Sequence, residues 1–425
     1  MQSYWEATRN ADVVSEPLAQ SMSADVAVVG AGFTGLATAY FLARRGVSVV
    51  VVEAERLGYG ASGRNGGQVL SGWPVEIVTV AERHGKSAAE ALWSLSEEAL
   101  ARVQALAGEE RIDCGLEAIG HLEAADSRSQ VATLERELAQ ISQWVKRPVA
   151  WWDGAMIESR IGTRAYRGGL FDPGSLAFHP LNYVLGLAAA VGRLGGQIYQ
   201  ETTIESIDAV GERSFRLSTS AGPTITASAV VLATNAYIPA FAHWLRSRIL
   251  PVHSAQIAVS LANPNALPER MPTVSDTKAE LNYYRRIGER TFLFGGRALT
   301  SELRAERFDS LAQQLVRLFP QLQGTRVTHQ WAGRIALSYD FLPHMTQMPD
   351  GIWAVGGYTG HGAALSTEMG YLLSEVVTGG KPDERLEALL ALPWRRFPLG
   401  RISRALFPLV LHVMDMRQRR ALARR

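Results

Sequence analysis

The chain has 425 residues, of which 47% are hydrophobic and 20% are charged. Values this close to the globular average exclude a mostly disordered chain, a coiled coil and a collagen-like fibre. The 43 basic and 41 acidic residues nearly balance, which argues against a protein that coats nucleic acid. The single cysteine, Cys114, excludes an internal disulfide and a cysteine-based metal site, and it favours a reducing, cytoplasmic setting.

A β-α-β unit is predicted near the start of the chain. Two short, continuous apolar runs, 25–30 and 47–52, have the pattern of buried parallel strands. Between them, residues 33–45 carry apolar side chains at helical spacing. Two more buried strands are predicted much later, at 229–233 and 351–355. If all four strands share one sheet, the domain that contains them is discontinuous.

The segments between these strands predict a second, strand-rich domain. Residues 87–107 and 127–145 have helical patterns, whereas 118–124, 255–261 and 290–296 have the patterns of strands or hairpins. We therefore expect a substrate-binding domain with few helices, built between the parts of the first domain.

The end of the chain differs from the rest in charge. Residues 394–425 hold nine arginines and one acidic residue, Asp415, so this tail has a net charge of +8 and the rest of the chain −6. The apolar run 405–414 within it is too short to span a bilayer. Two interpretations stay open: the run packs on the protein, or it makes peripheral contact with the anionic inner face of a membrane.

The first glycine motif, Gly30-Ala-Gly32-Phe-Thr-Gly35, follows a predicted strand and opens a predicted helix. Gly30 permits a tight turn, Gly32 lets the backbone approach a pyrophosphate, and Gly35 lets helix and strand pack closely. The helix N-terminus then offers free N–H groups to phosphates. Glu53, at the end of the second strand, can accept hydrogen bonds from ribose hydroxyls. The motif therefore predicts a dinucleotide-binding site.

A second glycine-rich segment, 58–68, has five glycines in eleven residues, so its backbone can lie against a flat ligand. Ser62, Arg64, Asn65 and Gln68 add hydrogen-bond donors. An NAD dehydrogenase does not require such a loop after the acidic residue. The alternative interpretation is a flexible surface loop.

The third cluster, 356–362, follows a strand and precedes the helix-like run 363–377. A helix N-terminus at this position suits an oxygen or nitrogen that becomes anionic. His361 lies within the cluster, where it is either a functional group or a structural histidine.

These motifs together resemble the D-amino-acid-oxidase-type FAD oxidoreductases, which include the glycine and sarcosine oxidases. Within that family the sequence is most similar to the gamma-glutamylputrescine oxidases. The run 64–68 and the arginine-rich tail point to this subfamily without determining the substrate. The segments that carry the resemblance are 3–7, 30–35, 60–68, 179–182, 233–237, 282–285, 294–296, 331–333 and 357–362.

The resemblance implies an α/β fold (α+β overall) of the glycine/sarcosine oxidase type. A Rossmann-type FAD-binding domain would be interleaved with a substrate-binding domain built on a mixed or antiparallel sheet. The expected boundaries are 20–110, 150–240 and 330–380 for the FAD-binding domain, 111–149 and 241–329 for the substrate-binding domain, and 381–425 for a basic, helical C-terminal tail.

The resemblance also implies non-covalent FAD and no metal. Sarcosine oxidases attach the flavin to a cysteine near the position of Ala332 or Gly333, and Cys114 lies far from it in sequence. The lysines that the sarcosine branch uses are missing here, at Ala364 and within 291–297. Reoxidation by O2, which yields H2O2, and transfer of electrons to a quinone therefore both stay open.

The expected cofactor contacts follow the glycine motifs and the strand ends beside them. They are Gly30, Gly32, Phe33, Thr34, Gly35, Glu53, Ala54, Gly60, Ala61, Ser62, Arg64, Asn65, Gly66, Gly67, Gln68, Ile204, Ala233, Thr234, Asn235, Gly333, Gly357, Tyr358, Gly360, His361, Gly362, Ala363, Ala364 and Leu365.

Aromatic residues are expected to wall an amine pocket, and an arginine to pair with a carboxylate. The alternative is that the aromatic residues are core and the arginine is solvated. The expected substrate contacts are Tyr283, Tyr284, Arg285, Trp331 and Tyr358, and the expected catalytic residues are His361, Gln68 and Tyr284.

The implied reaction is hydride transfer from the carbon that bears an amine to flavin N5, followed by hydrolysis of the imine. A gamma-glutamylputrescine-type amine is the first substrate hypothesis. A small secondary amino acid such as L-pipecolate, sarcosine or glycine is the second. An NAD(P)-dependent dehydrogenase and a non-catalytic nucleotide-binding module are alternatives of other classes.

Overall fold

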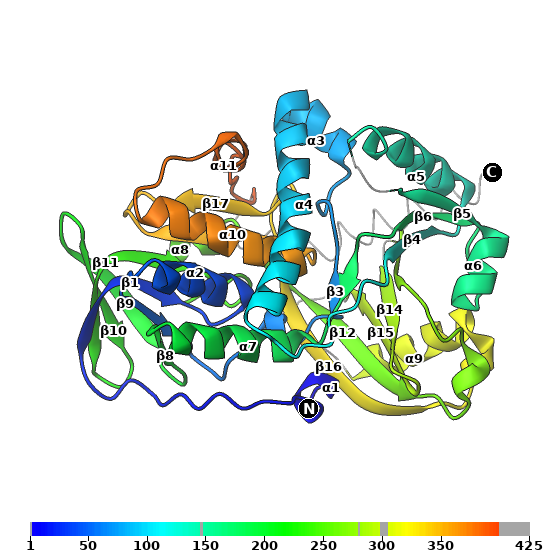
Figure 1. Ribbon diagram of the computed structural model, residues 1–425, viewed down its shortest axis with the longest axis horizontal. Helices are drawn as coiled ribbons and strands as arrows, with labels where there is room; N and C mark the ends of the chain where they lie inside the picture. The colour runs from blue at the N-terminus through cyan, green and yellow to red at the C-terminus, as the bar shows by residue number, and fades with distance from the viewer. Residues whose placement is uncertain (1, 145–147, 279–280, 298–304, 399–425) are drawn as a thin grey trace.

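The computed structural model describes residues 2–144, 148–278, 281–297 and 305–398. Its two large sheets lie side by side, with the long helix α4 between them (Figure 1). The helices are α1 Tyr4–Ala7, α2 Phe33–Arg44, α3 Ile77–His84, α4 Lys86–Glu109, α5 Arg128–Ile141, α6 Gly154–Ile161, α7 Pro180–Arg193, α8 His243–Arg246, α9 Glu306–Leu318, α10 Gly362–Val377 and α11 Glu384–Leu390, with short 3-10 turns η1 Ala61–Gly63, η2 Pro264–Ala266 and η3 Pro320–Leu322.

The strands β1 to β9 lie before residue 212, and the strands β10 to β18 follow. The first group is β1 Met22–Val29, β2 Val49–Val52, β3 Gln68–Val69, β4 His121–Ala125, β5 Ala150–Asp153, β6 Gly168–Asp172, β7 Leu176–Ala177, β8 Gln197–Tyr199 and β9 Ile204–Gly211. The second group is β10 Ser214–Thr219, β11 Thr224–Leu232, β12 Leu250–Ser260, β13 Thr273–Asp276, β14 Asn282–Ile287, β15 Thr291–Arg297, β16 Arg326–Leu337, β17 His344–Gln347 and β18 Trp353–Gly356.

The first sheet has the order β17-β18-β11-β1-β2-β8, and β10 and β9 extend from β11. The four strands predicted from apolar runs, β1, β2, β11 and β18, pair in parallel within it. Both faces are covered, because Val28 and Val51 belong to one hydrophobic cluster and Val29 and Val50 to the other. The strands come from distant parts of the sequence, so this half of the molecule is discontinuous.

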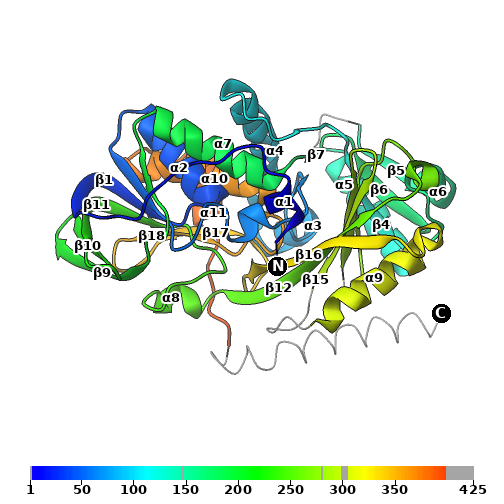
Figure 2. The ribbon, with the colours of Figure 1, turned by 90° about the horizontal axis from the view of Figure 1, so that it is seen from below.

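The second sheet has the order β16-β12-β15-β14-β13-β4-β6-β5 and is mainly antiparallel. Helices α6 and α9 cover one face, where their apolar side chains join its largest cluster (Figure 2). The domain boundaries predicted at 150 and 330 need correction. Strands β5 and β6 pair next to β4, and β16 pairs with β12 along nearly its whole length. These strands therefore belong to the second sheet.

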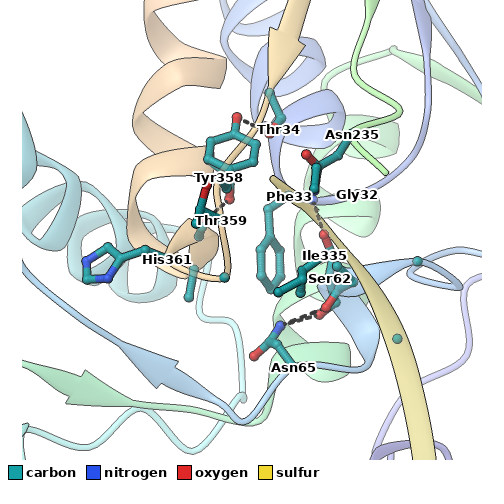
Figure 3. A pocket seen from close by; sticks show the side chains of 18 of the residues that line it. Gly32, Phe33, Thr34, Ser62, Asn65, Asn235, Ile335, Tyr358, Thr359 and His361 are labelled. Atoms are coloured by element: carbon teal, nitrogen blue, oxygen red, sulfur yellow. Dashed lines mark hydrogen bonds between the residues drawn. The ribbon is translucent and has the colours of Figure 1, made fainter. Parts of the chain in front are cut away.

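Helices α2 and α10 cross closely against one face of the first sheet. A Cβ atom at Gly370 of α10 would lie 2.6 Å from Ala37 Cβ and 2.7 Å from Thr34 O of α2. This glycine lets the two helix axes approach. The starts of the two helices also lie beside each other, where Thr34 and Tyr358 are hydrogen-bonded (Figure 3).

The basic tail is described only up to residue 398. Helix α11 packs on α4, and Arg385 forms ion pairs with Glu98 and Asp383. The apolar run 405–414, and with it the prediction of membrane contact, lies outside the described residues. In the part of the chain that the structure describes, every helix is too short or too polar to cross a bilayer.

Candidate active site

A cavity of about 880 Å³ lies where the two sheets meet. This volume is in the range of small-molecule and cofactor sites. One end is lined by the three glycine-rich segments of the first half, and the other by β4, α5 and β6 of the second half. We call these the cofactor end and the substrate end.

The first glycine motif forms a tight turn into α2 at the cofactor end. Gly30 has a φ of 108°, which favours glycine, and a Cβ at Gly35 would lie 1.9 Å from Gly30 O. Gly32, the N-cap residue of α2, has no side chain to cap the helix, so the N–H groups of its first turn other than that of Phe33 are available to a ligand. The buried Glu53 carboxylate accepts from Ala31 N at 2.9 Å and from Glu55 N at 3.1 Å, and burial raises its pKa above 4.5.

The second glycine segment folds back onto α2. The hydroxyl of Ser62 accepts a hydrogen bond from Phe33 N at 2.9 Å, and Asn65 Nδ2 donates to Ala61 O and Ser62 O at 3.1 and 3.0 Å (Figure 3). The segment is therefore held by its own side chains in a defined shape, which corrects the alternative interpretation of a flexible surface loop.

The third glycine cluster begins α10. Thr359 and Gly360 have φ angles of 53° and 92°, and this turn brings the uncapped start of α10 to the cavity. The Tyr358 hydroxyl lies 2.8 Å from Thr34 Oγ1, so it ties α10 to α2 (Figure 3). Two helix N-termini thus converge on the cofactor end, where their dipoles favour negatively charged groups.

His361 points away from Phe33 and Ile335 in the close-up view (Figure 3). Its Nε2 lies 2.8 Å from the carbonyl oxygen of Ser71, which can only accept, so Nε2 carries the proton. Burial lowers the pKa of His361 to about 4. The imidazole is therefore neutral at pH 7, and it links the third glycine cluster to the segment after β3.

The substrate end is polar and acidic. His121 lies 2.8 Å from Thr273 Oγ1 and 2.9 Å from Ser275 Oγ, and burial lowers its pKa to about 3. Asp172 accepts from the Ser71 and Ser175 hydroxyls at 2.7 and 2.9 Å.

Two further carboxylates line the substrate end, Glu123 on β4 and Glu137 on α5. Burial raises the pKa of both above 4.5, and nearby carboxylates, with Glu76 acting on both, raise them further. Within the described residues neither carboxylate has a hydrogen bond or an ion pair. With a pKa of about 7 for Glu123 and about 8 for Glu137, both groups are partly or mainly protonated at pH 7 in the empty site, and their oxygens are available to a ligand.

Most of the predicted residues meet in this cavity. Those in its lining are Gly30, Gly32, Phe33, Thr34, Glu53, Ala54, Gly60, Ala61, Ser62, Arg64, Asn65, Gly66, Gln68, Ile204, Ala233, Thr234, Asn235, Tyr283, Gly333, Tyr358, Gly360, His361, Gly362 and Ala363. Those placed behind the lining are Gly35, Gly67, Gly357, Ala364 and Leu365, with Tyr284, Arg285 and Trp331.

Three of the predicted substrate contacts need correction. Tyr284 points to the opposite face of β14 from Tyr283 and stacks on Phe294, because neighbouring strand residues alternate. Arg285 is buried and donates to Gly67 O at 2.7 Å. Trp331 is buried and donates to Arg64 O at 3.0 Å. The last two hold the backbone of the second glycine segment and do not face a substrate.

Several lining residues were missed in the sequence. They are single polar positions in strands or helices of the second half, and no local pattern marks them. The most informative are His121, Glu123, Glu137, Asp172 and Gln256.

Comparison with known proteins agrees with this geometry. The model of the family described as FAD dependent oxidoreductase matches residues 25–376. The chain belongs to this family.

Two curated relatives match this FAD dependent oxidoreductase over nearly its full length. It is 32% identical to a probable oxidoreductase OrdL of Haemophilus influenzae, over 96% of this chain and 94% of that protein. It is 30% identical to the gamma-glutamylputrescine oxidoreductase of Escherichia coli, over 95% of each chain. Among solved structures, the fold is similar to that of a glycine oxidase from Geobacillus kaustophilus, with a TM-score of 0.72, 23% identity and coverage of 88% and 99%. The protein is an FAD-dependent oxidoreductase of amines or amino acids.

The cofactor end fits FAD on its own observations. Gly30 and Gly32 bring bare backbone to the cavity, and the starts of α2 and α10 offer N–H groups to the phosphates and to the flavin ring. Thr234 Oγ1 is buried in the lining without a hydrogen-bond partner among the described residues, as expected of a group that binds a ligand. When bound, FAD supplies the acceptor for the two electrons of the substrate.

Proposed function

We propose that this protein oxidatively deaminates a cationic amine of the gamma-glutamylputrescine type. The carbon that bears the amine loses a hydride and the nitrogen loses a proton, and water then hydrolyses the imine to an aldehyde and releases the amine nitrogen. The observation that carries this proposal is the sign of the charges around the cavity.

Acidic side chains dominate the described part of the lining. They number six, against one arginine. That arginine, Arg64, lies at the cofactor end, where its Nε donates to Tyr59 O at 2.7 Å and its Nη2 lies 3.8 Å from Glu6. The three acids of the substrate end are Glu123, Glu137 and Asp172. A cationic substrate would therefore be attracted to this end of the cavity.

The neutral histidines support the same proposal. His121 and His361 would repel an ammonium group if they were protonated, but burial keeps the pKa of both far below 7. A bound ammonium group would in turn favour the ionised forms of Glu123 and Glu137, because an opposite charge nearby stabilises a carboxylate.

The name of the Escherichia coli relative supports the gamma-glutamylputrescine class. The alternative, a small secondary amino acid, would need a cation for its carboxylate near the substrate end. Arg285 was predicted for that role and lies behind the lining. The carboxylate of gamma-glutamylputrescine lies on its glutamyl part, far from the carbon that is oxidised, so that substrate needs no cation beside the reacting carbon. The charges of the described lining residues therefore favour it over a small amino acid.

We also propose that FAD is bound non-covalently in a cytoplasmic enzyme, with O2 as the acceptor. The lone thiol, Cys114, is buried outside the lining, and burial raises its pKa to about 11, so it remains protonated. A quinone acceptor is the alternative, and fractionation of a low-salt lysate would reveal membrane attachment.

Anaerobic reduction of the purified holoenzyme tests the function. The yellow protein is mixed with gamma-glutamylputrescine, putrescine, L-pipecolate, sarcosine or glycine, and the flavin absorbance is followed. We expect the cationic amine to bleach it at the lowest concentration, and peroxide to appear when air is admitted. Bleaching by the amino acids alone would reject the amine proposal. If the amine bleached the flavin but no peroxide appeared on aeration, O2 would be rejected as the acceptor and a quinone acceptor would be favoured.

A further inference from the structure

The carbonyl groups of the second glycine segment are held from outside the cavity by buried side-chain donors. Trp5 Nε1 donates to Asn65 O at 2.8 Å, and Trp331 Nε1 donates to Arg64 O at 3.0 Å. Arg285 Nη1 donates to Gly67 O at 2.7 Å. Tryptophans 5 and 331 are only 1% exposed, so water cannot replace them as donors.

The two tryptophans come from distant parts of the chain, Trp5 from α1 and Trp331 from β16. Helix α1 lies beside β16 in both views of the fold (Figures 1 and 2). The ring centroids of Trp5 and Trp331 are 6.4 Å apart, and Trp5 also packs on His179 at 4.8 Å. Neither tryptophan is in the cavity lining, whereas Asn65 and Gly66 are. The donors therefore lie behind the segment and the cavity in front of it.

This arrangement orients the peptide groups. In a trans peptide the N–H of each residue points opposite to the carbonyl of the residue before it. The chain has no cis peptide among its described residues. When Trp331 holds Arg64 O and Trp5 holds Asn65 O at the back, the N–H groups of Asn65 and Gly66 point to the front. Within the described residues these two N–H groups donate to no other protein group.

We propose that Trp5 and Trp331 are positioning residues for the flavin. Through the carbonyls of Arg64 and Asn65 they aim two adjacent N–H groups into the cavity, as donors to the flavin ring. Each held carbonyl also polarises its peptide, which strengthens the N–H group that faces the ligand. Donors of this kind stabilise the negative charge that the ring gains on reduction.

Gly66 shows why the segment needs this support. A Cβ at Gly66 would lie 2.9 Å from the Tyr283 ring, so no side chain can fix the backbone at this residue. Asn65 holds part of the segment from within, because its Oδ1 accepts from Gly67 N at 2.8 Å, and groups outside the segment hold the carbonyls. The N-terminal helix, which the glycine motifs alone would not connect with the cofactor, supplies one of them.

The test compares three Trp→Phe variants of the full chain. Trp5→Phe and Trp331→Phe each remove one donor and keep an aromatic ring. Trp394→Phe is the matched control, because Trp394 is 8% exposed, lies in the other hydrophobic cluster, and its Nε1 has no partner among the described residues. The readouts are the dissociation constant of FAD from the apoprotein, the midpoint potential of bound flavin and the melting temperature.

We expect Trp5→Phe to weaken FAD binding about tenfold, the effect of leaving one buried carbonyl without its donor. Trp331→Phe should weaken it less, because Gln256 Nε2 also donates to Arg64 O. Both variants should lower the midpoint potential. Trp394→Phe should leave the affinity and the potential at their wild-type values. If the two variants match Trp394→Phe in affinity and potential, the proposal is wrong, whatever happens to the melting temperature. Should one variant not fold, the other decides alone. No amine is used, so the result is independent of the proposed substrate.

Discussion

The two ends of the cavity are built by different means. At the cofactor end, backbone groups face the ligand: tight glycine turns, the uncapped starts of α2 and α10, and peptide N–H groups. At the substrate end, side chains from β4, α5 and β6 face it, and half of them are acidic. In our proposal the first end holds FAD and the second attracts the substrate. Changes at the first end should therefore abolish cofactor binding, and changes at the second should alter specificity.

The largest effect is expected from Gly35→Ala. The new Cβ would lie 1.9 Å from Gly30 O, so the turn that presents α2 must shift, at more than the ~1–3 kcal/mol of ordinary overpacking. We expect protein without yellow colour and with no measurable FAD affinity. Gly192→Ala is the control, because a Cβ there has no heavy atom within 4 Å. Normal FAD binding by Gly35→Ala would contradict the role of this turn.

Next in size are Glu123→Gln and Glu137→Gln. Each removes a carboxyl group that ionises when an ammonium group binds beside it, so KM for gamma-glutamylputrescine should rise about tenfold or more, the value of a lost charged hydrogen bond. FAD affinity should not change. Glu135→Gln, on the same helix as Glu137 but exposed, is the control for a change in net charge. If steady-state kinetics gave the same KM for all three variants, Glu123 and Glu137 would not bind the substrate.

The same carboxylates predict a dependence of stability on pH. Burial and neighbouring carboxylates raise the pKa of Glu123 and Glu137 in the folded protein above 4.5. Their contribution to stability is thus complete below the unfolded pKa and is lost as the pH rises through the folded pKa. The melting temperature of the substrate-free protein should fall from about pH 5 to about pH 9, and Glu137→Gln should flatten this fall. An equally steep fall in the variant would show that other groups cause it.

The smallest effect concerns His361. Its pKa of about 4 keeps it neutral, and its Nε2 proton is engaged with Ser71 O. We expect no step in kcat near pH 6.5 from this residue, and His361→Asn should lower kcat less than about tenfold, as for one neutral hydrogen bond. His243→Asn, at an exposed histidine, is the control. A loss of several orders of magnitude would restore His361 as a catalytic acid or base.

The sequence predicted the two ends unequally, and their construction explains why. Gly30, Gly32 and Gly35 lie in one short turn and Gly360 in another, so local spacing alone predicts the turns that open α2 and α10. Glu123 and Glu137 meet only because β4 and α5 fold against each other, and no spacing predicts that.

Trp331 and Arg285 show that a sequence motif does not predict which way a side chain faces. Aromatic and cationic residues in a matching motif predicted substrate contacts, but both side chains are buried and donate to the backbone of the second glycine segment. Sequence motifs placed them near the site correctly. Which way they face depends on the pairing of β14 and β16 within the second sheet.

We propose that carboxylates at the substrate end select a cationic amine. The most direct measurement is the ratio of kcat/KM for gamma-glutamylputrescine to kcat/KM for L-pipecolate, in the wild type and in the Glu123→Gln, Glu137→Gln double variant. We expect a ratio well above one in the wild type that falls at least tenfold in the double variant, at unchanged FAD content. A ratio that stays the same, or that favours L-pipecolate in the wild type, would contradict it.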